Sequence, residues 1–226
     1  MASTISANSA GGGGLVTSGD ASGVLNLQTA SVTALSIDAS QKVTFTNSLT
    51  LPTLTSPIIA GTPTGVGVLT SGTAVASTSG TSIDFTGIPS WVKRITVVLN
   101  GVSTSGTSPY LVQLGTSSGI DTTGYVSAAL AIQVSAVSSS ANTSTAGFLA
   151  VVAQIASTEL QNGHIIITNI SGNIWVQSGN VPNYAATRIT IGGGTKTTAS
   201  TLDRLRITTV NGTDTFDAGS INIMYE

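Results

Sequence analysis

Apolar side chains recur at every second position along much of the C-terminal part of this sequence. The clearest stretch runs from 91 to 100, and the residues expected on its buried side are Trp91, Ile95, Val97 and Leu99. Such stretches are separated by gaps that hold Gly, Asn, Asp or Ser, and no segment has the 3.6-residue period of a substantial helix. Since a period of two is the geometry of a strand, the sequence predicts an all-β chain.

Further strands are expected from the same alternation in residues 81–226. They are Tyr110–Leu114, Tyr125–Val134, Gly147–Ile155, His164–Asn169, Ile174–Gln177, Arg188–Ile191, Leu205–Thr209 and Ser220–Tyr225. Asn100-Gly101 is a turn signal, and Gly192–Gly194 is interpreted as a hairpin tip. About eight to ten short strands with frequent turns favour a C-terminal antiparallel β-sandwich or jelly-roll domain.

The scarcity of charge limits the partners of such a chain. Only 7% of the residues are charged, against roughly 25% in an average soluble domain, and the net charge is −2. This gives no basic field for nucleic acid, and an uncharged surface is most simply buried in a permanent oligomer. No apolar run approaches the roughly 20 residues of a membrane-spanning helix, so we expect no membrane insertion. The N-terminus lacks the pattern of a secretory signal, which favours assembly in a cytoplasm.

The composition changes along the chain and predicts four parts. Residues 1–20, with four consecutive glycines, are interpreted as a flexible leader that anchors the chain to another protein. Residues 21–51 hold three short alternating strands. Residues 52–80 contain three of the six prolines and predict a semi-rigid Pro/Gly-rich connector with short edge strands. Residues 81–226 form the predicted sandwich head.

The strands of residues 21–51 share one apolar face. Its members are Leu25, Leu27, Leu35, Ile37, Val43 and Phe45. Three such strands bury too little to stand alone, and stacking three copies of the chain around a threefold axis would cover the face. We therefore expect a short trimeric β shaft. The alternative is that these strands pack on the C-terminal domain of their own chain.

Few residues offer chemistry. His164 is expected to be a polar residue at the end of a strand, and Gly192–Gly194 lack the spacing of a phosphate-binding loop. Asp214 and Asp217 are three residues apart in a loop, where turn capping, calcium binding and acid catalysis are the alternatives in falling order of weight. Asp203 is expected to form an ion pair with Arg204 or Arg206. No catalytic, cofactor or metal site is assigned, and we expect no enzyme.

A resemblance to a known family adds to this interpretation. Residues 81–97 (TSIDFTGIPSWVKRITV) and 100–104 (NGVST) resemble a segment of phage and prophage tail-fibre-like and virion-appendage proteins. The ending 219–226 (GSINIMYE) resembles the final strand of the same module, and residues 17–29 are similar to the N-terminal segments of such proteins. The resemblance implies a place in the virion, a homotrimer and a role in attachment or particle architecture, and it carries over no catalytic residue.

Together these observations predict a structural protein of a bacteriophage particle, a trimeric tail fibre or spike that takes part in attachment to the host surface. Its expected partners are two further copies, other virion proteins at the leader, and a host-surface glycan at the head. Trp175, Tyr110, Tyr125 and Tyr184 are the expected stacking faces for a sugar. The alternative is a head fibre, collar fibre or capsid decoration protein with a purely architectural role.

Overall fold

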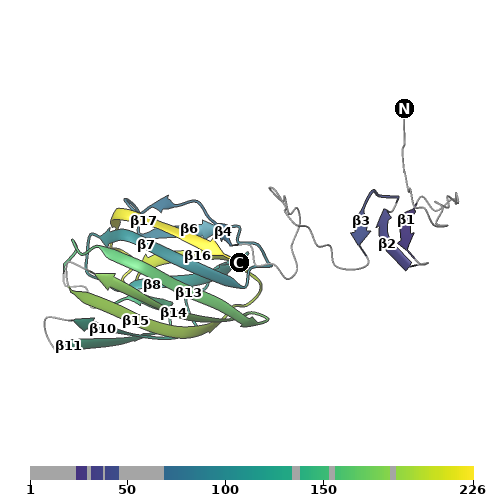
Figure 1. Cartoon of the computed structure of the whole chain (residues 1–226). Coiled ribbons are helices and arrows are strands. Elements are labelled where there is room, and N and C mark those ends of the chain that lie inside the picture. The colour runs from purple at the N-terminus through teal and green to yellow at the C-terminus, as the bar shows by residue number, and fades with distance from the viewer. Residues whose placement is uncertain are drawn as a thin grey trace. The chain divides into compact units, whose positions relative to one another are not determined.

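The computed structural model describes residues 24–29, 32–37, 39–45, 69–133, 138–152, 156–183 and 187–226. Within these ranges the regular elements are all strands, paired in antiparallel sheets, so the all-β prediction is confirmed (Figure 1). The described residues include no helix that could cross a membrane. The chain divides into two compact units, Met1–Ile59 and Ala60–Glu226, which we describe separately. The expected leader, residues 1–20, and most of the connector lie outside the described residues.

The first unit contains one small sheet. Its strands are β1 (Leu25–Thr29), β2 (Val32–Ile37) and β3 (Val43–Phe45), in the order β1-β2-β3. Both pairings are antiparallel, which matches chain segments joined by short turns. The three strands expected between residues 21 and 51 are thus confirmed.

The second unit, called the head here, contains a nine-stranded and a five-stranded sheet. The strands of the larger sheet are β4 (Thr70–Ser71), β5 (Val75–Ala76), β7 (Arg94–Thr104), β10 (Tyr125–Gln133), β11 (Ser138–Ser144), β13 (Gln161–Ser171), β14 (Ile174–Asn183), β15 (Arg188–Thr197) and β17 (Phe216–Tyr225). They are ordered β11-β10-β15-β14-β13-β7-β17-β4, and β5 also pairs with β17.

The smaller sheet lies behind the larger one in the view of Figure 1. Its strands are β6 (Ser82–Thr86), β8 (Tyr110–Thr116), β9 (Gly119–Ile120), β12 (Phe148–Val151) and β16 (Leu202–Thr209). The main path is β12-β8-β16-β6, with β9 paired to β8.

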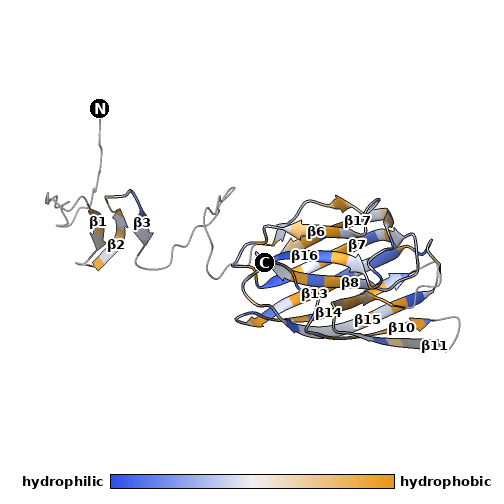
Figure 2. Cartoon of the chain, turned by 180° about the vertical axis from the view of Figure 1, so that it is seen from behind, coloured by the Kyte–Doolittle hydropathy of each residue, from blue (hydrophilic) through white to orange (hydrophobic). Residues whose placement is uncertain are grey.

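The core of the head consists of alternate residues from both sheets. From the larger sheet Ile95, Val97 and Ile167 are fully buried, and from the smaller sheet Leu114 and Leu205 meet them in one cluster. The intervening residues of these strands are less buried, as expected for side chains on the outer face. Figure 2 shows that hydropathy also alternates along many of the strands. The period-two prediction for the head is therefore confirmed for Ile95, Val97 and Leu99, and the head is a two-layered β structure.

The prediction for Trp91 is wrong. The residue lies in a turn at Ser90-Trp91, before β7 begins at Arg94, and its side chain is 40% exposed. Val92 is buried in its place, and its backbone N–H donates a hydrogen bond to the carbonyl oxygen of Pro89 at 3.1 Å. The turn shifts the alternation of inward and outward side chains by one residue. Extending the alternation of β7 backwards from Ile95 therefore placed Trp91 on the wrong face.

Two turn predictions also differ from the structure. At Asn100-Gly101 the strand does not reverse but continues to Thr104, and the pairing with β17 shifts register beside Gly101, whose φ is 63°. The signal marks a β-bulge, which needs the same positive φ as a tight turn. Gly192–Gly194, expected as a hairpin tip, lie inside the ten-residue strand β15.

Close packing explains glycines inside β15. A Cβ at Gly194 would lie 2.5 Å from the backbone oxygen of Val126 and 3.1 Å from a ring carbon of Phe148, whereas Gly193 faces outward with 3.2 Å to its nearest neighbour. We expect Gly194→Ala to lower the free energy of unfolding by about 1–3 kcal/mol. Gly193→Ala, the matched control, should stay within about 1 kcal/mol of the wild type in urea denaturation. Equal losses in both variants would contradict this account of the glycine run.

Candidate functional site

The apolar face of the small sheet is continuous across its three strands. In the register, Leu25 lies opposite Ile37, and Ile37 lies opposite Val43. Leu27 lies opposite Leu35, and Leu35 lies opposite position 45 in the next row of the same face. Since directly paired residues and those two apart in a strand point to the same side, the expected residues other than position 45 occupy one face. We call it the apolar shaft face.

Much of the apolar shaft face is accessible to solvent in the single chain. Leu25 is 51% exposed, Leu27 42% and Val43 48%, while Leu35 and Ile37 are half-buried. Covering a side chain of this size gains roughly 0.8 kcal/mol for each CH₂ group removed from water. Burial of the apolar shaft face would therefore stabilise an assembly appreciably. The sheet itself is too small to be stable alone.

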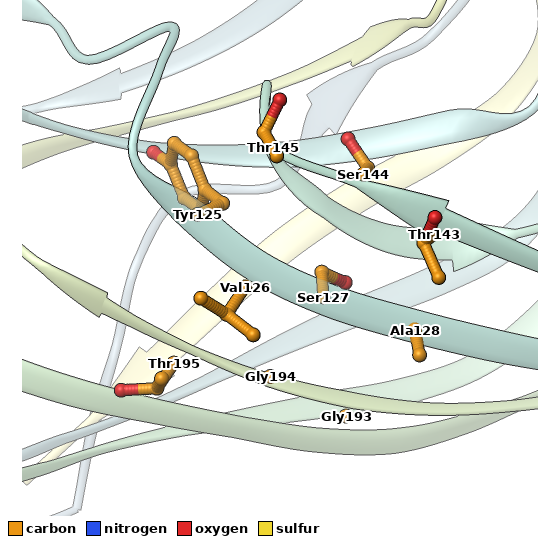
Figure 3. A pocket seen from close by; sticks show the side chains of 10 residues that line it. All are labelled: Tyr125, Val126, Ser127, Ala128, Thr143, Ser144, Thr145, Gly193, Gly194 and Thr195. Atoms are coloured by element: carbon orange, nitrogen blue, oxygen red, sulfur yellow. The ribbon is translucent and has the colours of Figure 1, made fainter.

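The head carries an open hollow of about 440 Å³ on the outer face of its larger sheet, over β11, β10 and β15 (Figure 3). The missing side chain of Gly193 and the small side chains of Ala128 and Thr143 form its floor. Tyr125 is the one titratable residue among the ten that line it, and that side chain is buried. The hollow offers hydroxyl groups and apolar surface but no acid–base pair.

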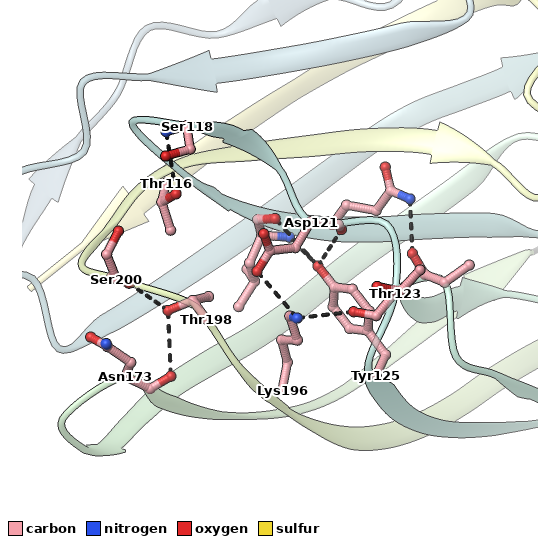
Figure 4. A network of polar contacts seen from close by, with 12 residues as sticks. Thr116, Ser118, Asp121, Thr123, Tyr125, Asn173, Lys196, Thr198 and Ser200 are labelled. Atoms are coloured by element: carbon pink, nitrogen blue, oxygen red, sulfur yellow. Dashed lines mark hydrogen bonds and ion pairs between the residues drawn. The ribbon is translucent and has the colours of Figure 1, made fainter.

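Beside this hollow, a polar network holds the loop between β9 and β10 (Figure 4). Lys196 Nζ lies 3.1 Å from a carboxylate oxygen of Asp121 and donates a hydrogen bond to the Thr123 carbonyl oxygen at 2.9 Å. The Tyr125 hydroxyl accepts a hydrogen bond from the Leu114 backbone N–H at 2.6 Å. Burial raises the pKa of Tyr125 far above its usual value, so the phenol is neutral at physiological pH. Every partner is internal, and the network is an anchor for the loop.

The two aspartates singled out in the sequence have separate partners. Asp214 accepts hydrogen bonds from the backbone N–H of Ser108 at 3.0 Å and from the Asn211 side-chain amide at 2.6 Å. Asp217 is the second residue of the last strand and accepts a hydrogen bond from the Ser103 hydroxyl. Asp214 thus has the capping role expected of a turn residue. Among the residues that the structure describes, no three His, Asp or Glu side chains gather as a metal site.

His164 lies within β13, between Val98 of β7 and Asn180 of β14, and its side chain is exposed. It is therefore an outward residue in the middle of a strand, not at a strand end. The reason is length: β13 begins three residues earlier than the alternation indicated, at Gln161.

The expected sugar-stacking residues are mostly unsuitable. Trp175 is 4% exposed, and Tyr110 and Tyr125 are equally buried, so their rings are core residues. Tyr184 lies outside the described residues. Trp91, by contrast, is exposed, and its ring centroid lies 5.8 Å from that of Tyr225. Strand β14 is inward at odd positions from 175 onward, and the three consecutive apolar residues Ile174, Trp175 and Val176 gave no signal of that phase.

The chain matches no protein-family model, no curated protein and no solved structure.

Proposed function

We propose that this chain is a non-enzymatic structural protein of a bacteriophage particle, a short trimeric fibre or spike that takes part in attachment to the host. A three-stranded shaft unit, a leader that docks on another virion protein and a jelly-roll head are parts of this proposal. Its support is the all-β architecture, the scarcity of charge and the resemblance of residues 81–104 and 219–226 to virion-appendage proteins.

The apolar shaft face is the observation that carries the proposal. A three-stranded sheet has a buried side only if something covers it, and a threefold axis lets three identical faces cover one another. The same arrangement places strand edges against neighbouring copies and so protects them from uncontrolled pairing. Two further copies of the chain are therefore the partners that the geometry favours.

A purely architectural head fibre, collar fibre or decoration protein is the second candidate. The shortness of the strand repeat favours it, because three strands of three to six residues suit a small appendage better than a long fibre. Both candidates share the trimer and differ in whether the head binds the host.

Light scattering of the purified full chain tests the proposal. We expect three times the chain mass of 22.5 kDa, independent of protein concentration over the micromolar range. A folded, stable monomer would contradict the shaft model.

Removing residues 1–20 should separate folding from attachment to the particle. The leader is rich in glycine and small polar residues, which contribute little to a core but can become ordered against a partner. We expect the truncated chain to keep the melting temperature of the wild type and its assembly of three chains, and to be missing from purified particles. Normal incorporation would show that the anchor lies elsewhere in the chain.

A further inference from the structure

Charge gathers at one place on this charge-poor chain, the outer face of the smaller sheet. Of the seven basic and nine acidic residues, four lie there together: Asp84, Asp203, Arg204 and Arg206. They come from β6 and β16. In Figure 2, blue segments alternate with orange and pale ones along β16. Two guanidinium groups and two carboxylates give a surface that is strongly polar and has no net charge.

The four side chains form two bidentate ion pairs. Arg206 stands directly opposite Asp84 in the sheet, and its Nε and Nη2 donate to the two carboxylate oxygens at 2.7 Å each. Arg204 donates to both oxygens of Asp203, at 2.7 and 3.2 Å. The hydrogen bond from Arg204 holds the pKa of Asp203 below its usual value, so the charges persist at mildly acidic pH. Paired in this way, the four side chains have fixed orientations.

Three of the four, Asp84, Arg204 and Arg206, form one wall of a cleft of about 280 Å³. The other wall consists of Gly119 and Ile120 of β9 and Thr122 of the loop that follows it. We call this hollow the charged cleft. Its volume is below the roughly 300–1,000 Å³ of pockets for drug-sized ligands, which suits a single small ring.

Two glycines make this close arrangement sterically allowed. A Cβ at Gly115 would lie 2.6 Å from Cγ of Arg204 and 2.5 Å from the carbonyl oxygen of Gly119, so the arginine stem and the hairpin can meet only over a glycine. Gly119 has a φ of +131°, which side chains rarely adopt. The cleft is thus shaped by the backbone.

The chemistry of the cleft matches a neutral ligand that is rich in hydroxyl groups. Each guanidinium uses two of its five N–H groups on its aspartate, and the Asp84 carboxylate and the hydroxyls of Thr86 and Thr122 can accept hydrogen bonds. Because each guanidinium is already paired with a carboxylate, the cleft offers no unbalanced charge to an ion, whereas a sugar hydroxyl donates and accepts at once. Ile120 adds apolar surface for the C–H face of a ring.

We propose that the charged cleft binds one neutral hexose unit of a surface glycan. That the glycan belongs to a host surface rests on the proposed function, whereas the binding of a hexose at the cleft is argued from the geometry alone.

Saturation-transfer NMR on the intact chain tests this inference, with the methyl α-glycosides of glucose, galactose and mannose as probes and N-acetylneuraminic acid as the acidic comparison. We expect transfer to at least one neutral glycoside, and affinity lower by about tenfold or more in Arg206→Gln. The matched control is Arg94→Gln, which breaks an exposed pair with Glu226 on the other sheet and should bind like the wild type. Thr122→Val, an exposed loop change, should also weaken binding and serves if Arg206→Gln fails to fold.

Three results would overturn the inference: no transfer to a neutral glycoside, transfer only to the acidic sugar, or equal binding by wild type, Arg206→Gln and Thr122→Val. The mass of each sample is measured in parallel. A trimer without sugar binding contradicts this inference alone, and a monomer that binds sugar contradicts the proposed trimer alone.

Discussion

Replacing both Leu35 and Ile37 with aspartate is expected to leave a monomeric chain with a folded head. These residues occupy the central strand of the apolar shaft face, with partners on both sides. Two charges from each chain, six around a threefold axis, cannot be buried together without neutralisation. Sedimentation velocity should show one chain instead of three. The melting transition of the head should remain, because the head has its own core.

Ser36→Asp with Thr44→Asp is the matched control. These residues are paired with each other one position away from the apolar rows, so their side chains point to the opposite face. The variant adds the same charge to the same sheet, on β2 and β3, and should remain trimeric. If both double variants lose the trimer, charge alone is responsible; if neither does, the assembly face lies elsewhere.

Trp175→Ala is expected to lower the free energy of unfolding by about 3–5 kcal/mol, the usual cost of truncating a buried large aromatic residue. The side chain is 4% exposed and belongs to the main core cluster. Its indole Nε1 has no hydrogen-bond partner among the described residues, so the loss is one of packing. For a chain of this size the melting temperature should fall by about 10 °C.

Trp91→Ala is the comparison within the same chain. This ring is 40% exposed and contacts Tyr225, so its removal should cost about 1 kcal/mol or less. Thermal and urea denaturation of the two variants decide the assignment. A large loss for Trp91→Ala with a small one for Trp175→Ala would mean that the faces are reversed.

The alternation of side chains predicted most strands because burial has the same period as the strand itself. Ile95, Val97 and Leu99 are buried as expected, and the rows of the apolar shaft face fall in register. The strand β11, Ser138–Ser144, was missed because a polar run of Ser, Asn and Thr carries no apolar alternation. Such a strand can form at a sheet edge, where pairing with β10 supplies its backbone partners.

The sequence predictions were wrong where a turn or bulge changes the alternation of side chains, and where a residue packs against strands that are distant in the sequence. The turn before β7 moved Trp91 to the surface, and the bulge at Gly101 used a turn signal inside a strand. Gly192–Gly194 have a tertiary cause, because Phe148 and Val126 belong to other strands. Local sequence contains no information on such contacts.

The candidate sites were predicted to different degrees. The residues of the apolar shaft face followed from the sequence, since one stretch of chain holds them all. The charged cleft did not: Asp203 and Arg204 are neighbours and were expected to pair, but Asp84 lies 122 residues from Arg206. Only the sheet register brings these two together. The exposure of the aromatic residues was likewise predicted wrongly, because it depends on which residues of a strand point inward and the predicted strand ends were incorrect.

The location of the chain on intact particles tests the central claim most directly. Purified particles from an infection that produces this chain would be labelled with an antibody raised against residues 81–226 and imaged by electron microscopy. The account predicts label at discrete, repeated sites, with the chain released from the particles as a species of three chain masses. Particles free of the chain, with the protein recovered only from the soluble fraction of the host, would contradict it.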